Sequence, residues 1–232
     1  MGNGYKENTE KNNMKRIGEV DALRGIAIIL MIIYHFFFDL DYLGIADINL
    51  NDIGWILFQR VIGSMFLLLA GISIVLSERK HHDYMRHARR AAILGAVALL
   101  ITAATWIYPH EGFIKFGIIH MIALSTLIAP LFLRFGWMNV VLGIIIIAAG
   151  LQVHYTDIDY LFWLGPITKG YFALDHYPLV PWFGLVLIGT YLGQKIEFKN
   201  RKEGWLEIMG RNSLMIYLIH QPVIYFLLGL LL

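Results

Sequence analysis

The sequence predicts an all-α membrane protein, a polytopic bundle of about seven transmembrane helices. Two observations lead to this fold class. The 232-residue chain is 58% hydrophobic and only 16% charged, with a mean hydropathy of +0.61, whereas about a quarter of the residues in soluble domains are charged. Its apolar residues also gather in runs of roughly 20, the length at which a helix rising ~1.5 Å per residue crosses a bilayer. We therefore expect one transmembrane domain over residues 20–232, preceded by a flexible cytoplasmic tail at residues 1–19.

Seven apolar runs qualify as spans. In chain order they cover residues 20–39, 54–77, 90–108, 115–133, 137–153, 179–195 and 211–232. The first run is too long for a signal-peptide core and no small-residue cleavage site follows it, so we expect the tail to be retained. Gly184, Gly189 and Gly193 in the sixth run are expected to allow close helix packing. The aromatic connection at residues 154–177 is expected at the membrane interface.

Charged residues in the connections predict how the spans are oriented. Lysine and arginine concentrate in the tail and in the second, fourth and sixth connections, for example at Arg79, Lys80 and Arg134, whereas the other connections are mainly acidic. Because cytoplasmic loops are enriched in lysine and arginine, the N-terminus should lie inside. An odd number of spans then places the C-terminus outside, in a multi-pass protein of the cell membrane.

The composition excludes several kinds of chemistry. The chain has no cysteine, which rules out disulfides, thiolate metal sites, iron–sulfur clusters and an acyl-cysteine intermediate. The formal net charge is only +2, and no basic pattern supports nucleic-acid binding. We expect no metal site.

The first span carries ionisable side chains toward both ends. Arg24 lies about one turn in from the predicted cytoplasmic side, and His35 follows eleven residues later, roughly 16 Å further along a helix. Asp39, at i+4 from His35, could orient one ring nitrogen and leave the other as a base. Ionisable groups within spans are costly and usually functional. The simpler alternatives are an arginine that reaches the interface beside Asp21 and a histidine held by ordinary packing.

Other polar residues are expected at the same outer level as His35. They are Arg60 at the start of the second span, His120 one turn into the fourth, and Asp175 and His176 before the sixth. Taken singly, each is better explained as a packed or surface residue, whereas their shared level favours a common cavity that includes His35 and His120. His81, His82 and His87, in the basic second connection, are expected to be solvated.

The seventh span has a polar start and a polar middle. The string GRNSL places Arg211, Asn212 and Ser213 at a helix start, where a cation, a capping side chain and free backbone N–H groups suit a phosphate. Ordinary capping with a positive-inside anchor is the alternative. His220 and Gln221 precede a proline near the middle of the span. The proline leaves a carbonyl free, and the polar pair can line a cavity.

Three stretches carry a resemblance to known families. The string Asp21-x-x-Arg24-Gly25, followed by His35, resembles the first-span signature of the acyltransferase-3 membrane proteins. The stretches DHYPLVPWFG at residues 175–184 and GRNSLMIYLIHQP at residues 210–222, with the order of the spans, are more similar to the prokaryotic relatives of heparan-alpha-glucosaminide N-acetyltransferase. This resemblance covers most of the chain.

The resemblance implies an acyl transfer across the membrane. The donor would be cytoplasmic acetyl-CoA, and the acceptor a hydroxyl or amine of an extracytoplasmic sugar or glycolipid. Residues 20–232 would then be a single transmembrane acyltransferase domain, and a homodimer is suggested. Residues 40–53 contain no histidine, although the eukaryotic acetyltransferase is expected to carry its essential histidine in this loop. Because His35 matches the acyltransferase-3 position instead, direct transfer and an acyl-histidine intermediate both stay open.

The polar residues receive roles on this basis. The residues expected to bind acetyl-CoA are Arg24, Arg211, Asn212, Ser213, His220 and Gln221. We expect His35, oriented by Asp39, to deprotonate the acceptor or to attack the thioester. His120 or His176 would steady the oxyanion or the acceptor.

Three other classes of protein compete with this interpretation. A proton-coupled small-molecule transporter would use the outer polar residues and the broken seventh span as its pathway, although no inverted repeat is visible. A haem-binding electron carrier would pair His35 with His120. An accessory subunit would leave costly buried polar residues without a role. The acidic outer connections argue faintly against a strongly anionic acceptor.

Overall fold

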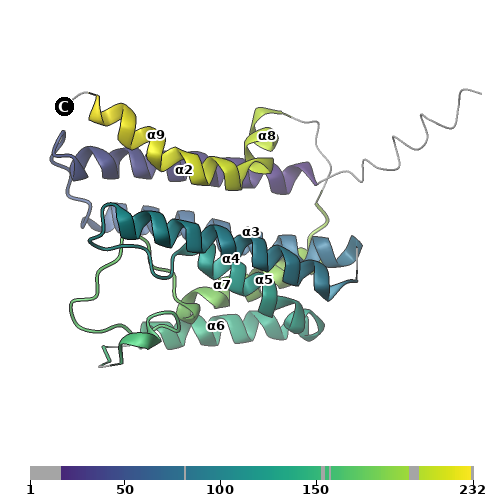
Figure 1. Cartoon of the computed structure of the whole chain (residues 1–232). Helices are drawn as coiled ribbons and strands as arrows, with labels where there is room; N and C mark the ends of the chain where they lie inside the picture. The colour runs from purple at the N-terminus through teal and green to yellow at the C-terminus, as the bar shows by residue number, and fades with distance from the viewer. Residues whose placement is uncertain (1–16, 81, 153–154, 157, 199–203, 231–232) are drawn as a thin grey trace, which may run out of the picture. The chain divides into compact units, whose positions relative to one another are not determined.

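The computed structural model describes residues 17–80, 82–152, 155–156, 158–198 and 204–230. Its elements, in chain order, are α2 (Gly18–Tyr42), α3 (Ile53–Lys80), α4 (Tyr84–Ile107), α5 (Ile118–Ile128), η1 (Ala129–Phe135), α6 (Met138–Leu151), η2 (Asp159–Leu161), α7 (Leu179–Lys195), α8 (Trp205–Arg211) and α9 (Ser213–Gly229). Within these residues only two isolated β-bridges accompany the helices, which confirms the all-α class (Figure 1). Of the predicted tail, residues 1–16 lie outside the described residues, and Gly18 and Glu19 already belong to α2.

Four helical segments in the described part of the chain are long and apolar enough to cross a membrane. They are α2, α3, α4 and the combined run of α5 and η1, Ile118–Phe135; the bent pair α8 and α9 is a fifth candidate. Helix α6 has 14 residues and α7 has 17, which is about 21 and 25 Å of helix against ~30 Å of hydrocarbon. The chain is therefore a membrane protein with four or five membrane-capable helices, and the seven-span topology stays a prediction.

The described chain divides into two compact units. The first comprises the chain up to Gln59 and from Glu197 on, and the second is Arg60–Ile196. Helix α3 begins in the first unit and continues in the second. That residues 20–232 act as a single domain stays a prediction.

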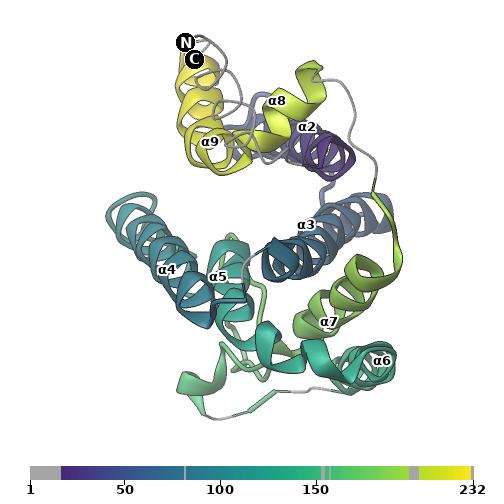
Figure 2. The same cartoon turned by 90° about the vertical axis from the view of Figure 1, so that its right-hand side faces the viewer.

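In the first unit, α8 and α9 pack on α2 (Figures 1 and 2). Helix α8 contacts the start of α2, where Gly210 lies against Asp21. Helix α9 then follows α2 in the same direction, since His220 lies against His35 further along α2. The two C-terminal helices are bent by 86° at their junction. The predicted seventh span, residues 211–232, therefore begins with a sharp corner at Asn212.

Two glycines let α8 lie directly on α2. A Cβ atom at Gly25 would collide with the backbone of Leu206, and one at Gly210 would collide with the backbone carbonyl of Asp21. Small residues at a crossing let two backbones approach, which matters in lipid because burial of apolar surface there gives little driving force. The glycine of the first-span string and the glycine that opens GRNSL thus meet in space.

The second unit contains the helices α4 to α7 and most of α3 (Figure 2). Helix α4 lies against α5, and α6 lies against α7. A Cβ atom at Gly184 of α7 would collide with the carbonyl of Gly143 on α6, and one at Gly189 would collide with the carbonyl of Leu68 on α3. Gly193 also lies against the backbone of α3. The predicted role of these α7 glycines in close packing is confirmed.

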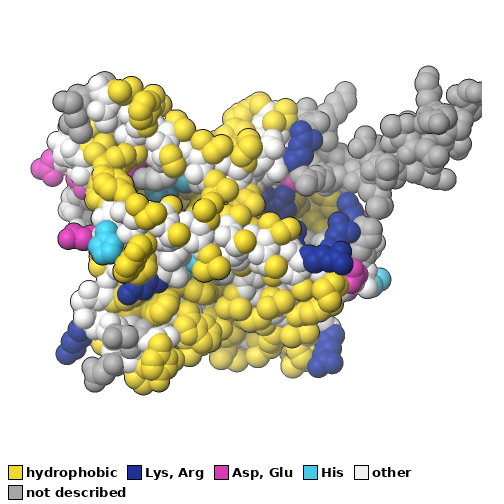
Figure 3. Space-filling model, viewed as in Figure 1, with side chains coloured by type: hydrophobic (Ala, Val, Ile, Leu, Met, Phe, Trp, Pro, Cys, Tyr) yellow, Lys and Arg dark blue, Asp and Glu magenta, His cyan; other side chains and the backbone are white. Residues whose placement is uncertain are grey.

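Several lysine and arginine residues share one end of the second unit. Figure 3 shows hydrophobic side chains distributed along α4, which lies in front of α3 in this view, with lysine and arginine near the junction of the two helices. At that end, Arg79 donates a hydrogen bond of 2.8 Å to the carbonyl of Gln194, and the Gln194 amide donates one of 2.7 Å to the carbonyl of Leu133. The ends of α3, α7 and η1 therefore meet there, and they bring Arg134 and Lys195 to the same end.

His87, near the start of α4, is buried, so the prediction of a solvated side chain was wrong. It is 2% exposed, and its Nε2 lies 2.9 Å from Oε2 of Glu78 on α3. His82 is exposed and lies 3.4 Å from the other oxygen of the same carboxylate, and His81 lies outside the described residues. A histidine in a corner between two helices can be covered by either helix, and its sequence neighbours do not reveal this.

We expect Gly210→Ala to destabilise the protein. The added methyl group would meet backbone atoms of α2 that cannot move aside, and overpacking of this kind costs about 1–3 kcal/mol. Thermal unfolding in detergent measures the loss. The control is Gly229→Ala, because nothing lies within 4 Å of a Cβ atom there and alanine is the better helix former. Equal unfolding temperatures for the two variants would contradict the close approach of α8 and α2.

Candidate active site

Four of the predicted polar residues meet in the first unit. His35 and Asp39 lie one turn apart on α2, and His220 and Gln221 are adjacent on α9. The ring centroids of His35 and His220 are 4.9 Å apart, and Nε2 of Gln221 donates a hydrogen bond of 2.7 Å to Oδ1 of Asp39. These four residues are called the His–Asp cluster below. The structure thus brings together residues that the sequence assigned to acyl transfer and to donor binding.

Each member of the His–Asp cluster has a buried polar atom without a hydrogen-bond partner. These atoms are Nδ1 of His35, Oδ2 of Asp39, Nε2 of His220 and Oε1 of Gln221. Most buried polar atoms in folded proteins are hydrogen-bonded, so an exception calls for an explanation. Four exceptions in one place indicate a site at which a polar ligand or water completes the hydrogen bonds.

The His220 ring is held in one tautomer. Its Nδ1 lies 2.6 Å from the carbonyl oxygen of Tyr217, and a carbonyl oxygen can only accept, so Nδ1 carries the proton. In the neutral ring, Nε2 then carries a lone pair, and it is this nitrogen that has no partner. General-base histidines are arranged in this way, with one nitrogen oriented by a hydrogen bond and the other available to the substrate.

Asp39 contacts Gln221 and not the residue that it was expected to orient. Although it lies one turn from His35, the hydrogen bond of its carboxylate in the described structure goes to the Gln221 amide. Asp39 is 1% exposed, so this hydrogen bond is shielded from solvent. Asp39 therefore fixes the position of Gln221, and through it the alignment of α9 on α2.

Aromatic side chains surround the His35 ring. The ring of Tyr34 lies 5.6 Å from that of His35, and the ring of Phe38 lies 6.4 Å from it. Trp55, at the start of α3, lies 6.2 Å from Tyr34. A wall of low polarity strengthens hydrogen bonds and charge interactions inside it. In these surroundings, the few polar groups of the His–Asp cluster can interact strongly with a bound substrate.

The expected phosphate-binding residues lie near the start of α2 and at the corner between α8 and α9. Arg24 forms an ion pair with Asp21, and Arg211 is exposed at the end of α8. Asn212 donates from its side chain to the carbonyl of Ile208, at 2.9 Å, and does not cap α9. The expectation of a capping asparagine was wrong because the sharp corner turns its amide back toward α8. The backbone N–H groups at the start of α9, from Ser213 on, consequently have no side-chain cap.

His120 of the second unit is engaged through both ring nitrogens. The backbone N–H of Gly117 donates to Nδ1 at 3.2 Å, and Nε2 lies 3.1 Å from the hydroxyl of Thr102 on α4. Because Nδ1 accepts, Nε2 carries the proton of the neutral ring and donates to Thr102, which in turn donates to the carbonyl of Ile114. This arrangement ties α5 to α4, and the predicted catalytic role of His120 stays a prediction.

His176 lies beside the start of α5 in the second unit. Its Nδ1 is 3.3 Å from the hydroxyl of Tyr171, and its Nε2 is buried without a partner. Burial lowers the pKa of His176 to about 4. Its neighbour Asp175 accepts a hydrogen bond of 2.9 Å from the backbone N–H of Ile118 and so holds this segment on α5. The ring of His176 is therefore neutral at physiological pH and has one open nitrogen.

Comparisons with known proteins identify the family. The family model described as "Heparan-alpha-glucosaminide N-acetyltransferase, catalytic" matches residues 16–222. The chain belongs to this family. No curated protein and no solved structure matches the chain. Membership of the heparan-alpha-glucosaminide N-acetyltransferase family indicates a membrane acetyltransferase, implies an acetyl-CoA donor, and gives no support to the transporter alternative.

The matched range of the heparan-alpha-glucosaminide N-acetyltransferase family includes the whole His–Asp cluster. Sequence reasoning found all four members, but it missed the contact between His35 and His220. It also missed Tyr171 as the partner of His176. Within the described residues, no group of three or more histidine, aspartate or glutamate side chains could hold a metal ion.

His176 should make the stability of this acetyltransferase depend on pH. Burial lowers its pKa from 6.5 to about 4, so between these values the unfolded chain takes up a proton that the folded chain does not. The stabilisation is complete above pH 6.5 and declines as the pH falls toward 4. Unfolding temperatures in detergent, measured from pH 7.5 to 4.5, should therefore fall more steeply for the wild type than for His176→Gln. Parallel curves would show that His176 is accessible to protons in the folded state.

Proposed function

We propose that the protein transfers an acetyl group from cytoplasmic acetyl-CoA to a hydroxyl or amine of a sugar or glycolipid on the other side of the cell membrane. Family membership supports the reaction class. The observation that carries the mechanism is the His–Asp cluster. There a histidine with an oriented lone pair on Nε2 lies against a second histidine with an open Nδ1.

The donor lies along α2 in this mechanism. Coenzyme A has phosphates at one end of a long, thin arm and the thioester at the other. Arg24 and His35 are eleven residues apart on α2, a distance of about 16 Å along the helix. Arg24, Arg211 and the uncapped start of α9 hold the phosphates, and the pantetheine arm extends toward the His–Asp cluster.

The direction of transfer follows from the distribution of cations. In the second unit, Arg79, Arg134 and Lys195 lie at the same end, which the positive-inside rule places in the cytoplasm. The proposal includes seven spans, with the N-terminus inside and the C-terminus outside. It also includes a homodimer located in the cell membrane.

Direct transfer uses the cluster for acid–base catalysis. The acceptor nitrogen or oxygen attacks the thioester carbonyl, and Nε2 of His220 or Nδ1 of His35 takes the proton that the acceptor loses. The tetrahedral intermediate then expels the coenzyme A thiolate, which takes up that proton. In the alternative route, a His35 ring nitrogen attacks the thioester and expels the coenzyme A thiolate. The acceptor then displaces the acetyl group from that nitrogen, and its proton passes to His220 or to the thiolate. The roles predicted for His120 and His176, steadying the oxyanion or the acceptor, belong to either route.

His35→Ala should abolish acetyl transfer and leave acetyl-CoA binding within about twofold. Loss of a general base lowers rates by about 10²–10⁴, and a nucleophile is indispensable. Transfer is measured from labelled acetyl-CoA to glucosamine, and donor binding is measured by thermal shift. The matched control is His82→Ala, which removes an exposed histidine. A fully active His35→Ala variant would eliminate the acyl-histidine route and His35 as the base of direct transfer, which leaves only Nε2 of His220 as that base. Label retained on the wild type without acceptor, and absent from the variant, would select the acyl-histidine route.

Removal of the Arg24 cation should abolish stabilisation by acetyl-CoA. Because Arg24 is paired with Asp21, Arg24→Gln alone would leave a carboxylate that is 6% exposed without its partner. The comparison is therefore between Asp21→Asn, which keeps the cation, and Asp21→Asn/Arg24→Gln, which lacks it. At one hundred times its dissociation constant, acetyl-CoA should stabilise the first by about 2.7 kcal/mol and the second hardly at all. An equal thermal shift in both variants would remove Arg24 from the donor site.

A further inference from the structure

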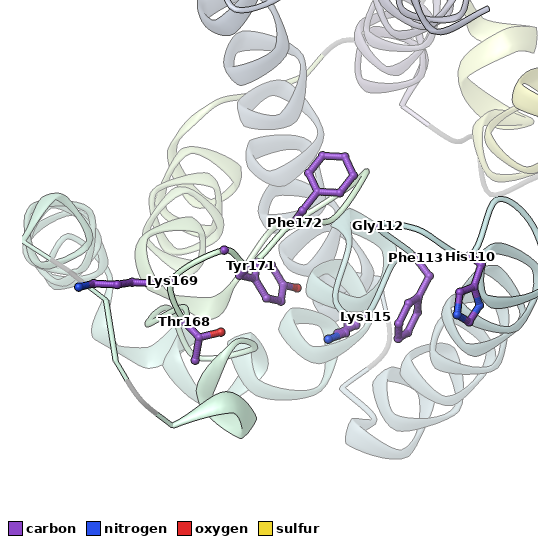
Figure 4. A pocket seen from close by; sticks show the side chains of 9 residues that line it. His110, Gly112, Phe113, Lys115, Thr168, Lys169, Tyr171 and Phe172 are labelled. Atoms are coloured by element: carbon purple, nitrogen blue, oxygen red, sulfur yellow. The ribbon is translucent and has the colours of Figure 1, made fainter.

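The second unit contains an open pocket between two loops, residues 110–115 and 168–172, that neither the donor site nor the His–Asp cluster uses. Its volume is about 360 Å³. The first loop joins α4 to α5, and the second belongs to the long connection before α7. Figure 4 shows side chains of both loops, with Lys115 and the Tyr171 hydroxyl turned toward each other and the Lys169 side chain extending away from them. We call this site the lysine pocket.

Backbone hydrogen bonds hold the two loops together. The N–H of Leu174 donates to the carbonyl of Gly112 at 2.8 Å, and the N–H of Tyr177 donates to the carbonyl of Phe116 at 3.0 Å. Gly112 has φ +68°, and a Cβ atom at this position would collide with the ring of Phe172. The lysine pocket is therefore a built feature of the fold and not a chance gap between two independent loops.

The lining of the lysine pocket includes two lysines. Lys115 and Lys169 line it, together with polar and aromatic residues, and no carboxylate is among its lining residues. The Lys115 ammonium lies 5.2 Å from the ring centre of Phe113 and 5.4 Å from that of Tyr171, so aromatic faces fix its position. Burial, reinforced by Asp175, raises the pKa of Tyr171 to about 12. The phenol therefore stays neutral and adds no negative charge. Its hydroxyl lies 3.3 Å from Nδ1 of His176 and can donate to a phosphate when that nitrogen carries the His176 proton.

The lysine pocket lies at the end of two candidate spans. Helix α4 ends at Ile107 and α5 begins at Ile118, so the first loop is where the chain leaves and re-enters the apolar layer. Trp106, Ile107 and Tyr108 are exposed beside it, and Phe172 is 65% exposed at the pocket itself. Exposed aromatic residues at span ends mark the membrane–water interface. A ligand of the pocket can therefore keep an anionic group in water and an apolar chain in lipid.

We propose that the lysine pocket binds the phosphate group of a lipid-linked ligand at the membrane surface. The phosphate meets the Lys115 ammonium and the Tyr171 hydroxyl, with Lys169 at the rim. Two kinds of ligand carry such a phosphate, namely a phospholipid headgroup and a sugar linked to a lipid phosphate. That this ligand is the acetyl acceptor rests on the proposed function, whereas the phosphate site itself does not.

The test compares farnesyl phosphate with farnesol, which lacks only the phosphate. The full chain is placed in nanodiscs of phosphatidylcholine, and binding is measured by isothermal titration calorimetry. We expect farnesyl phosphate to bind at least tenfold more tightly than farnesol. Lys115→Gln should weaken farnesyl phosphate binding about tenfold, Lys169→Gln should weaken it less, and Lys115→Arg should preserve it. Arg134→Gln, which removes an exposed cation far along the chain, is the matched control and should bind as the wild type does.

Two results would overturn the proposal. One is equal affinity for farnesol and farnesyl phosphate. The other is unchanged affinity for farnesyl phosphate in both glutamine variants, with unfolding temperatures that show all variants to be folded. Weakening by Arg134→Gln as large as that by Lys115→Gln would also count against the pocket, because it would reveal a general effect of surface charge.

Competition then separates the two sources of the phosphate. Displacement of farnesyl phosphate by dihexanoyl phosphatidic acid and by glucosyl farnesyl phosphate with equal potency supports a lipid headgroup. Stronger displacement by the glycosylated compound supports a lipid-linked sugar as acceptor. Acetyl-CoA thermal shifts on the same samples keep the two proposals apart. If acetyl-CoA stabilises the protein but farnesyl phosphate does not bind, only the lysine-pocket proposal is rejected. If farnesyl phosphate binds but acetyl-CoA gives no thermal shift, only the acetyltransferase mechanism is rejected.

Discussion

The crossing of α8 over the start of α2 determines the geometry of the first unit. It exists because Gly25 and Gly210 have no side chains, so that each faces the backbone of the opposite helix. In lipid, where apolar burial contributes little, such backbone contact is a main source of helix association. The crossing also sets where the chain turns at Asn212 and how α9 is placed along α2. The hydrogen bond between Asp39 and Gln221 and the contact between His35 and His220 both depend on that placement.

The sequence predicted the fold where hydropathy and length are sufficient. The first span, expected at residues 20–39, is the helix Gly18–Tyr42. The second span lies within an apolar helix, and the third and fourth overlap apolar helices with ends shifted by a few residues. The C-terminal span could not be predicted in the same way. Composition shows that residues 211–232 are apolar, but it does not show the 86° corner before Ser213, which accompanies the packing of Gly210 on α2. That contact joins residues far apart in the chain.

For the candidate site, the residues could be predicted from the sequence but their contacts could not. The cost of polar groups in lipid was enough to single out His35, Asp39, His220 and Gln221. Their partners were not predictable, because spacing along one helix gives distances within that helix only. Asp39 was therefore expected to meet His35, one turn away, and it meets an amide on α9 instead. The burial of His87 could not be predicted either, because it lies in a basic connection of the sequence but is covered at the corner between α3 and α4.

The open hydrogen-bonding positions of the His–Asp cluster affect the resting protein. Buried polar atoms without protein partners hold water whenever no other ligand satisfies them. In the proposed reaction, water beside the lone pair of His220 would be a nucleophile, so a thioester that arrived before the acceptor would be exposed to slow hydrolysis. A protein of this design has either to bind its acceptor first or to lose some donor in unproductive turnover. The hydrogen bonds left open among these four side chains of α2 and α9 would therefore influence the order in which donor and acceptor bind.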